Sequence, residues 1–159
     1  MERRRDYSWT DPAEIAAAAP LTSGVEFLRR MIAGEIPQPP IAHTLQFELV
    51  EASEGCVVLV AHPAEFEYNA IASVHGGVIA TWADTSIGYA VQTRLAPGQS
   101  LTTLDLQVRY LRPITADLGD VTITAVTDHV GRRTATARSE IVDGSGRLLA
   151  TATSTCLVL

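Results

Sequence analysis

The residues most suited to chemistry lie between positions 69 and 84, where an asparagine, a His-Gly-Gly sequence and one aspartate interrupt a largely apolar stretch. Gly76 and Gly77 open a predicted helix, whose first N–H groups have no partner inside the helix and carry partial positive charge. Glycine allows a substrate to approach such a backbone closely, which suits an oxyanion that forms on a carbonyl. The two glycines would equally allow the start of the helix to pack tightly against a strand.

Asp84 is the second candidate, because it stands among residues that we expect to be buried. A buried carboxylate is costly unless it is paired or used. No arginine or histidine lies three or four residues away to pair with it along the helix. Asp84 is therefore either a functional carboxylate, or a residue that faces solvent or bonds to Ser86 or a neighbouring strand.

The spacing of these two candidates has a structural consequence. Gly76 and Asp84 are eight residues apart, which is roughly 12 Å along a helix axis. One substrate carbonyl cannot contact both within one chain. If both act on one carbonyl, a second subunit must supply one of them. Two such helices packed antiparallel across a two-fold axis would bring Gly76 of one chain to Asp84 of the other, and the function would then require a dimer with two equivalent sites.

Two polar residues precede the helix. Asn69 could orient a water molecule or hold a carbonyl, although asparagine is also common in turns without any function. His75 could help to shape the site or could simply belong to the first helical turn.

The surrounding pattern predicts an α+β domain with an antiparallel sheet. Apolar positions at helical spacing predict a buried helix from residue 76 to about residue 93. Clean alternation predicts a strand in which Leu104, Leu106, Val108 and Tyr110 share one face. Further strands are predicted around residues 43–52, 54–63, 120–130, 132–142 and 147–159, with a hairpin turn at 143–146.

The first forty residues are predicted to be a helical extension and linker, followed by one domain over residues 41–159. Helices are expected near residues 11–19 and 24–35, and an extended linker at residues 36–41.

Composition limits the function classes. The chain has 159 residues, of which 47% are hydrophobic and 19% charged, as in a single globular domain. Its net charge of −6 argues against general nucleic-acid binding, and no apolar run is long enough to span a membrane. The start does not read as a signal peptide. Cys56 and Cys156 lack metal-ligand spacing, so two free thiols and a cytoplasmic location are expected.

The residues named above, together with "TTLDLQVRYLRP" and "HVGRRTATARSEIVDGSGRLLATATST", resemble the hotdog-fold acyl-CoA thioesterases. The resemblance is greatest to the branch of phenylacetate-degradation and 4-hydroxybenzoyl-CoA thioesterases, and it covers about residues 40–159. It implies a sheet of five or six strands wrapped around a central helix, and a homodimer that often pairs into a homotetramer. It also implies that the site lies between subunits.

The resemblance further implies a role for each matching residue. The N–H at Gly76 would polarise the thioester carbonyl, and Asp84 would act as nucleophile or as general base for water. Asn69 would help to position the water or the carboxylate. A hydroxyl at the start of the next strand would assist, for which Thr103 matches best, whereas alternation with Leu104 also allows Thr102.

The substrate would be an acyl-CoA, with no further cofactor and no metal. "GRR" resembles the phosphate-contacting position of the family, which makes Arg132 and Arg133 candidates for coenzyme A, although a solvated turn is an equal alternative. Gly77 would lie beside the thioester. Trp82 is expected to help line the acyl pocket.

Two other functions are compatible with the fold. A hotdog hydratase or dehydratase would pair a histidine with an acid, but the "HFP…PG" signature of the acyl-carrier dehydratases is absent. A non-catalytic acyl-CoA-binding module would not need the complete set of Asn69, Gly76 and Asp84. The leading hypothesis is a thioesterase of a small or medium acyl-CoA, aromatic acyl groups included.

Overall fold

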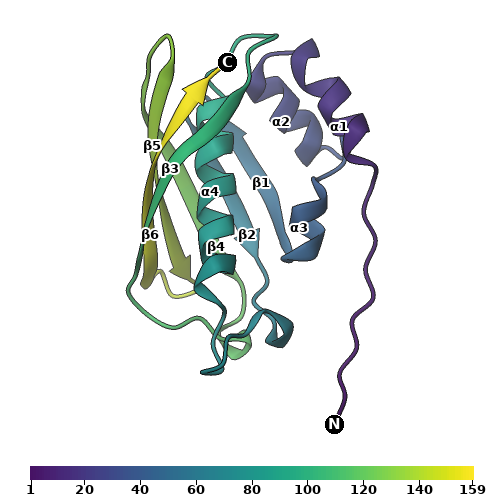
Figure 1. Cartoon of the computed structure of the whole chain (residues 1–159), viewed down its shortest axis with the longest axis vertical. Coiled ribbons are helices and arrows are strands. Elements are labelled where there is room, and N and C mark those ends of the chain that lie inside the picture. The colour runs from purple at the N-terminus through teal and green to yellow at the C-terminus, as the bar shows by residue number, and fades with distance from the viewer.

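A computed structural model describes all residues 1–159 and shows one six-stranded antiparallel sheet with a long helix, α4, on one face (Figure 1). Helix α4 spans Gly76–Gln92. The strands are β1 (Phe47–Ser53), β2 (Cys56–Ala61), β3 (Leu101–Tyr110), β4 (Val121–Val130), β5 (Thr134–Asp143) and β6 (Leu148–Val158). Their order in the sheet is β1-β2-β4-β5-β6-β3. This arrangement confirms the hotdog fold expected from the sequence.

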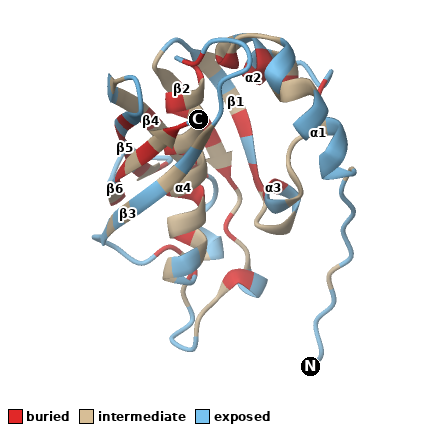
Figure 2. Ribbon diagram, turned by 45° about the horizontal axis from the view of Figure 1, so that its top comes forward, coloured by how far each residue is buried: buried red, intermediate tan, exposed pale blue.

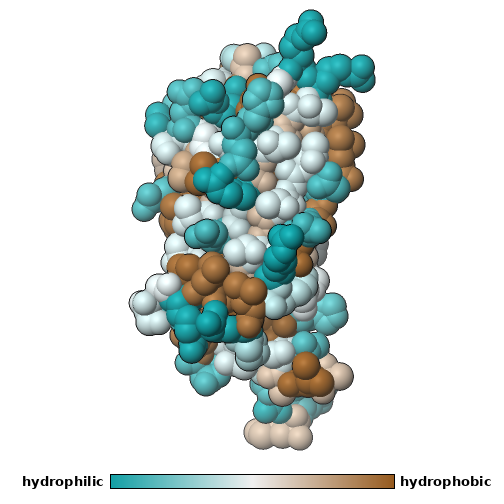
Figure 3. Space-filling model, turned by 90° about the vertical axis from the view of Figure 1, so that its left-hand side faces the viewer, coloured by the Kyte–Doolittle hydropathy of each residue, from teal (hydrophilic) through white to brown (hydrophobic).

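Small side chains on the sheet allow α4 to lie close to its middle strands. Ala125, Ala135, Ala137, Ser139 and Ala152 are all buried on the face toward the helix. Thr134, Thr136, Arg138 and Glu140 of β5 alternate with these residues and are exposed, as expected for a sheet with one solvated face. Figure 3 shows the side of the molecule at the left of Figure 1, whose surface is largely pale or hydrophilic with separate hydrophobic areas.

The N-terminal helices are α1 (Pro12–Ala18), α2 (Gly24–Ile32) and α3 (Pro40–Thr44). Asp11 caps α1, as its sequence predicts, by accepting a hydrogen bond from the Ala13 N–H at 2.9 Å. Helix α2 contributes Phe27, Leu28 and Met31 to the same core as the sheet, so the N-terminal extension does not have a core of its own.

One α-helix was absent from the sequence prediction. The segment expected as an extended linker contains the start of α3, because Pro40 occupies the first helical position and Pro39 the extended N-cap. Proline has a suitable φ for the first helical residue and loses no helical hydrogen bond there. Three short 3-10 helices complete the chain: η1 (Ala19–Leu21), η2 (Glu65–Glu67) and η3 (Ala116–Leu118).

The two edges of the sheet, β1 and β3, differ in how they are covered. Helix α2 packs against β1, whereas no residue of the ten in β3 is buried (Figure 2). Such a long open edge offers unpaired backbone groups to another strand. The chain has no helix that is long and apolar enough to cross a membrane. Cys56 and Cys156 are both free, and only Cys156 is buried.

Candidate active site

The first turn of α4 leaves one backbone donor free. His75 is the N-cap, and its Nδ1 accepts a hydrogen bond from the Gly77 N–H at 2.9 Å. The N–H groups of Val78 and Ile79 both reach the His75 carbonyl. The Gly76 N–H is thus the one donor of this turn without an acceptor in the chain, and the helix dipole adds to its positive character.

These contacts revise the role expected for Gly77. Its N–H is occupied by His75 and is not free for a substrate. The imidazole must accept through Nδ1, so its proton lies on Nε2. His75 therefore acts on the site by consuming the neighbouring donor, which isolates Gly76 as the oxyanion candidate.

Asn69 shapes the loop that leads to this helix. Its Oδ1 accepts hydrogen bonds from the Ile71 N–H at 2.9 Å and the Ser73 N–H at 3.3 Å, and its Nδ2 donates to the Ser73 Oγ at 3.1 Å. Ala72 adopts a positive φ of 59° inside this turn. The side-chain amide thus builds the turn beside Gly76, which is the structural role that asparagine commonly has.

Glu67 lies at the base of the same loop and was not singled out by the sequence. Its backbone carbonyl accepts a hydrogen bond from the His75 N–H at 2.8 Å. Its side-chain Oε2 accepts from the Ala64 N–H at 3.0 Å, while Oε1 is buried without a partner. Burial raises the pKa of Glu67 to about 7, although the hydrogen bond from Ala64 and the charge of Arg5 lower it.

The replacement of Glu67 by glutamine should stabilise the chain in a pH-dependent way. The folded protein keeps the Glu67 proton up to about pH 7, whereas the unfolded chain loses it near the ordinary value of 4.5. The wild type therefore loses stability as pH rises between these values, and the loss is complete above them. We expect the free energy of unfolding of Glu67→Gln to exceed that of the wild type by on the order of 2 kcal/mol at pH 8, and by little at pH 5. Thermal unfolding at the two pH values measures the difference.

The exposed Glu14 provides the control for this experiment. Glu14→Gln should leave the difference in melting temperature between pH 5 and pH 8 equal to that of the wild type. A Glu67→Gln protein whose gain over wild type is the same at both pH values would contradict the burial of an uncharged carboxyl at neutral pH.

The carboxylate half of the site lies at the middle of α4. The Thr103 hydroxyl, on β3, donates a hydrogen bond to Asp84 Oδ1 at 2.8 Å. A cavity of about 390 Å³ starts at Asp84 and runs over Gly88 to Gln92, with Ala19 of the N-terminal extension in its wall. A second hollow on the other side also contains Asp84 and Thr103. Asp84 is only half-buried, so it can meet a substrate from either side.

The structure distinguishes between the two candidate threonines. Thr103 is half-buried on the helix side of β3, whereas Thr102 is exposed. Simple alternation also allows Thr102, because it puts Thr102 on the same face as Leu104. Leu104 is in fact 56% exposed, since β3 has an irregular register with β6 between Thr103 and Asp105.

The donor half of the site is a separate hollow. A cavity of about 370 Å³ is lined by Asn69, Gly76, Tyr110 and Arg112, and does not include Asp84. The Tyr110 hydroxyl donates to the Gly76 carbonyl at 2.8 Å, which fixes the peptide beside the free donor. The sequence showed Tyr110 only as a strand residue. One chain thus presents the donor and the carboxylate in different places, as the helical spacing predicted.

The remaining candidates lie away from the reacting groups. Trp82 is fully buried on the core side of α4, where its indole N–H donates to the Leu45 carbonyl at 3.2 Å, and it lines neither cavity. Arg132 and Arg133 are exposed in the turn between β4 and β5. This turn lies at the end of the sheet where α4 ends, opposite Gly76 (Figure 1).

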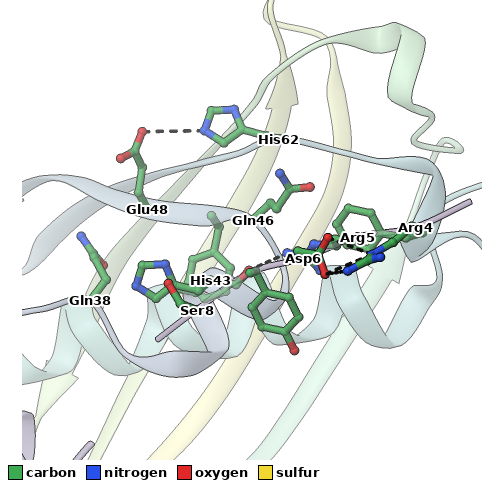
Figure 4. A pocket seen from close by; sticks show the side chains of 13 residues that line it. Arg4, Arg5, Asp6, Ser8, Gln38, His43, Gln46, Glu48 and His62 are labelled. Carbon is green, nitrogen blue, oxygen red and sulfur yellow. Dashed lines mark hydrogen bonds and ion pairs between the residues drawn. The ribbon is translucent and has the colours of Figure 1, made fainter. Parts of the chain in front are cut away.

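The largest cavity is elsewhere. It has a volume of about 710 Å³ and lies between the N-terminal residues 4–8, α3 and the start of β1. Figure 4 shows His62 near Glu48, and the His62 ring also pairs with Asp120 at 2.7 Å. Neither Gly76 nor Asp84 lines this cavity. Arg4 pairs with Asp6, and the Arg5 guanidinium donates to the His43 and Thr44 carbonyls. The cavity offers no donor set directed at a carbonyl, so we place the candidate active site on α4.

Three comparisons with known proteins identify the family of this chain. The profile of the thioesterase superfamily matches residues 72–150, which include His75, Gly76, Asp84 and Thr103. A crystal structure from Ralstonia eutropha JMP134, provisionally named a thioesterase and a phenylacetic acid degradation-related protein, is 30% identical. The match covers 82% of this chain and 98% of that chain, with a TM-score of 0.74.

Two further proteins are similar over different extents. The smu.793 protein of Streptococcus mutans UA159, solved with acetyl CoA bound, has a TM-score of 0.65 at 24% identity, over 71% of this chain and 88% of that chain. The protein VNG_1336C of Halobacterium salinarum, provisionally named an esterase, is 43% identical over 61 residues, which are 36% of this chain. The match spans only 40% of the length of that curated relative. By its profile match, its fold and its similarity to nearly the whole of the Ralstonia protein, the chain belongs to the hotdog-fold thioesterase superfamily.

Proposed function

We propose that this protein hydrolyses the thioester of a small or medium-sized acyl-CoA, an aromatic acyl group included, to the free acid and coenzyme A. One observation carries the proposal: the single free N–H of the first turn of α4, at Gly76, accompanies a carboxylate at Asp84 that Thr103 holds in place. Membership of the thioesterase superfamily supports it. The acetyl CoA in the Streptococcus protein and the phenylacetic acid in the name of the Ralstonia protein support the substrate class.

The complete site requires two chains. One face of α4 is half-exposed and carries mainly small residues, namely Gly77, Thr81, Asp84 and Gly88. It lies beside the open edge of β3, none of whose residues is buried. A second copy of the chain, packed antiparallel on this face, would cover the half-exposed face of α4 and the edge of β3. It would also bring Gly76 of the second copy to Asp84 of the first. We propose a homodimer with two such sites, which pairs further into a homotetramer.

The reaction follows from the two halves. The Gly76 N–H of one chain donates to the thioester oxygen and draws electrons from the carbonyl carbon. Asp84 of the other chain takes a proton from water, and the hydroxide adds to that carbon. The tetrahedral oxyanion stays on the Gly76 N–H until the carbon–sulfur bond breaks. The departing thiolate takes the proton that Asp84 removed from water. The products are a carboxylic acid and the thiol of coenzyme A.

Thr103 has a defined part in this scheme. Its hydroxyl donates to Oδ1 of Asp84, which orients the carboxylate and leaves Oδ2 available for the water proton. No further cofactor or metal enters the proposed reaction.

The phosphates of coenzyme A need a basic surface. We propose that Arg132 and Arg133 supply it, because both are exposed and the ion pairs of the chain involve other arginines. Antiparallel packing would bring this turn of one chain toward the Gly76 hollow of the other, which already contains Arg112. Because the two cysteines are free thiols, a reducing cytoplasm is the expected location.

A panel of acyl-CoAs tests the proposal through the release of free thiol, with kcat/KM for each substrate. We expect turnover of several small, medium and aromatic acyl-CoAs, together with a dimer or tetramer by light scattering. Crotonyl-CoA should be hydrolysed and not hydrated at its double bond. Hydration of crotonyl-CoA, or tight binding of every acyl-CoA without turnover, would contradict the proposed activity.

A further inference from the structure

The strand that carries Thr103 contains a β-bulge. Along β3 and β6, Thr103 pairs with Cys156 and Asp105 pairs with Thr155, so Leu104 has no partner of its own. The extra residue shifts the alternation of β3 by one position. Leu106 is half-buried toward α4, and an unbroken strand would therefore also turn Leu104 toward the helix and Thr103 away from it. The bulge is the feature that places the Thr103 hydroxyl on Asp84.

Two hydrogen bonds hold the bulge, and both involve Asp105. The Ser154 hydroxyl, whose residue is only 4% exposed, donates to the Asp105 carbonyl at 2.6 Å. The Thr155 N–H donates to the Asp105 carboxylate Oδ1 at 3.2 Å. A side-chain oxygen thus accepts the bond that a strand carbonyl would accept in a regular ladder, and the Asp105 carbonyl and the Thr155 N–H both have partners beside the bulge.

We infer that Asp105 is a positioning residue for the reaction, because it secures the bulge that turns Thr103 toward Asp84. This inference rests on the proposed function, since it concerns how the carboxylate of the proposed site is oriented. Asp105 does not touch the substrate in this scheme. It acts through Thr103, and its relevant property is an acceptor oxygen for the Thr155 N–H, not its negative charge.

Two substitutions distinguish the hydrogen-bond acceptor of Asp105 from its negative charge. Asp105→Ala removes the acceptor for Thr155, whereas Asp105→Asn removes the charge and keeps an oxygen at Oδ1. We expect Asp105→Ala to lower kcat by about 10- to 100-fold with little change in KM, because a small displacement of a catalytic group is costly. Asp105→Asn should retain activity within about two-fold of wild type.

A double-mutant cycle shows whether Asp105 acts through Thr103. Thr103→Ala alone should lower kcat by an amount similar to Asp105→Ala. The kcat of the double variant should be no lower than that of Thr103→Ala. If Asp105 acts only through Thr103, its removal has no further effect once the Thr103 hydroxyl is absent. Losses that multiply in the double variant would overturn the inference, and so would an Asp105→Asn enzyme as damaged as Asp105→Ala.

Crystal structures of the two Asp105 variants give a readout that is independent of turnover. The Thr103–Asp84 hydrogen bond should be lost in Asp105→Ala and kept in Asp105→Asn. If the wild type hydrolyses no thioester, the proposed function fails, but these structures still test the positioning role. A Thr103 hydroxyl that remains on Asp84 in the alanine variant would reject it.

Discussion

Replacement of Asp84 by asparagine is expected to lower acyl-CoA hydrolysis by about 10²- to 10⁴-fold, the range for loss of a general base. The asparagine can still accept the hydrogen bond that Thr103 donates at 2.8 Å, so the local structure should survive. The amide cannot take a proton from water, and it is a poor nucleophile. The loss is therefore expected whether Asp84 activates a water molecule or attacks the thioester itself. Free-thiol release under saturating acyl-CoA measures the effect on kcat.

The matched control is Asp120→Asn, which changes an exposed aspartate that pairs with His62 away from α4. This variant should keep wild-type turnover. The Asp84→Asn protein should have the same size by light scattering and the same unfolding temperature as the wild type within a few degrees. Full activity of Asp84→Asn would reject both the site and the reaction proposed for it.

The same variant can reveal whether the site is shared between chains. Gly76→Pro removes the free N–H but suits the first position of a helix, where proline is well tolerated. Each variant alone should be inactive. In a hybrid dimer, the Gly76 of the Asp84→Asn chain would meet the intact Asp84 of the Gly76→Pro chain and form one complete site. Random mixing after joint refolding should restore about 25% of wild-type activity, because half of the dimers are hybrids with one site of two. A mixture that stays inactive would mean that the site is not shared in this way.

Much of this architecture follows from periodicity. Alternation predicted the strands that became β1 and β3, because side chains on a sheet with one buried face repeat every two residues. Turn residues between the remaining segments predicted the other four. Composition and capping located α4 and α1, and the helical spacing of Gly76 and Asp84 separated the donor from the carboxylate. Periodicity failed at β3, where one bulged residue changes the face of every residue beyond it. A bulge depends on contacts with Ser154 and Thr155 of another strand, which single-strand patterns do not contain.

The apolar pattern of α4 also predicted more burial than the helix has. Its composition suggested a helix buried on most sides, but Thr81, Asp84 and Gly88 lie on a half-exposed face. Small residues are nearly neutral in hydropathy, so the pattern cannot distinguish a face covered by this chain from a face left for another. The capture of the Gly77 N–H by His75 is likewise a matter of side-chain geometry that residue types alone do not reveal.

Gly24→Ala is expected to produce the largest loss of stability. Gly24 begins α2 and lies against the end of α4, where its N–H donates to the Leu95 carbonyl at 3.1 Å. A Cβ on Gly24 would lie 1.7 Å from the Gln92 carbonyl oxygen and 2.6 Å from its carbon. Both are backbone atoms, so a rotamer change cannot relieve the overlap, and α2 must move away from α4.

That movement would disturb the packing of α2, which buries Phe27, Leu28 and Met31 in the common core. We expect a loss of about 3 kcal/mol, at the upper end for an overpacked site, and a fall of about 10 °C in the unfolding temperature. Gly144→Ala is the control, because a Cβ at that position meets no atom within 4 Å. Since Gln92 and Leu95 also line the cavity that starts at Asp84, the Gly24 variant should show a raised KM for the larger acyl-CoAs. An unfolding temperature equal to that of Gly144→Ala would contradict this prediction. It would mean that α2 can move away from Gln92 without a loss of stability.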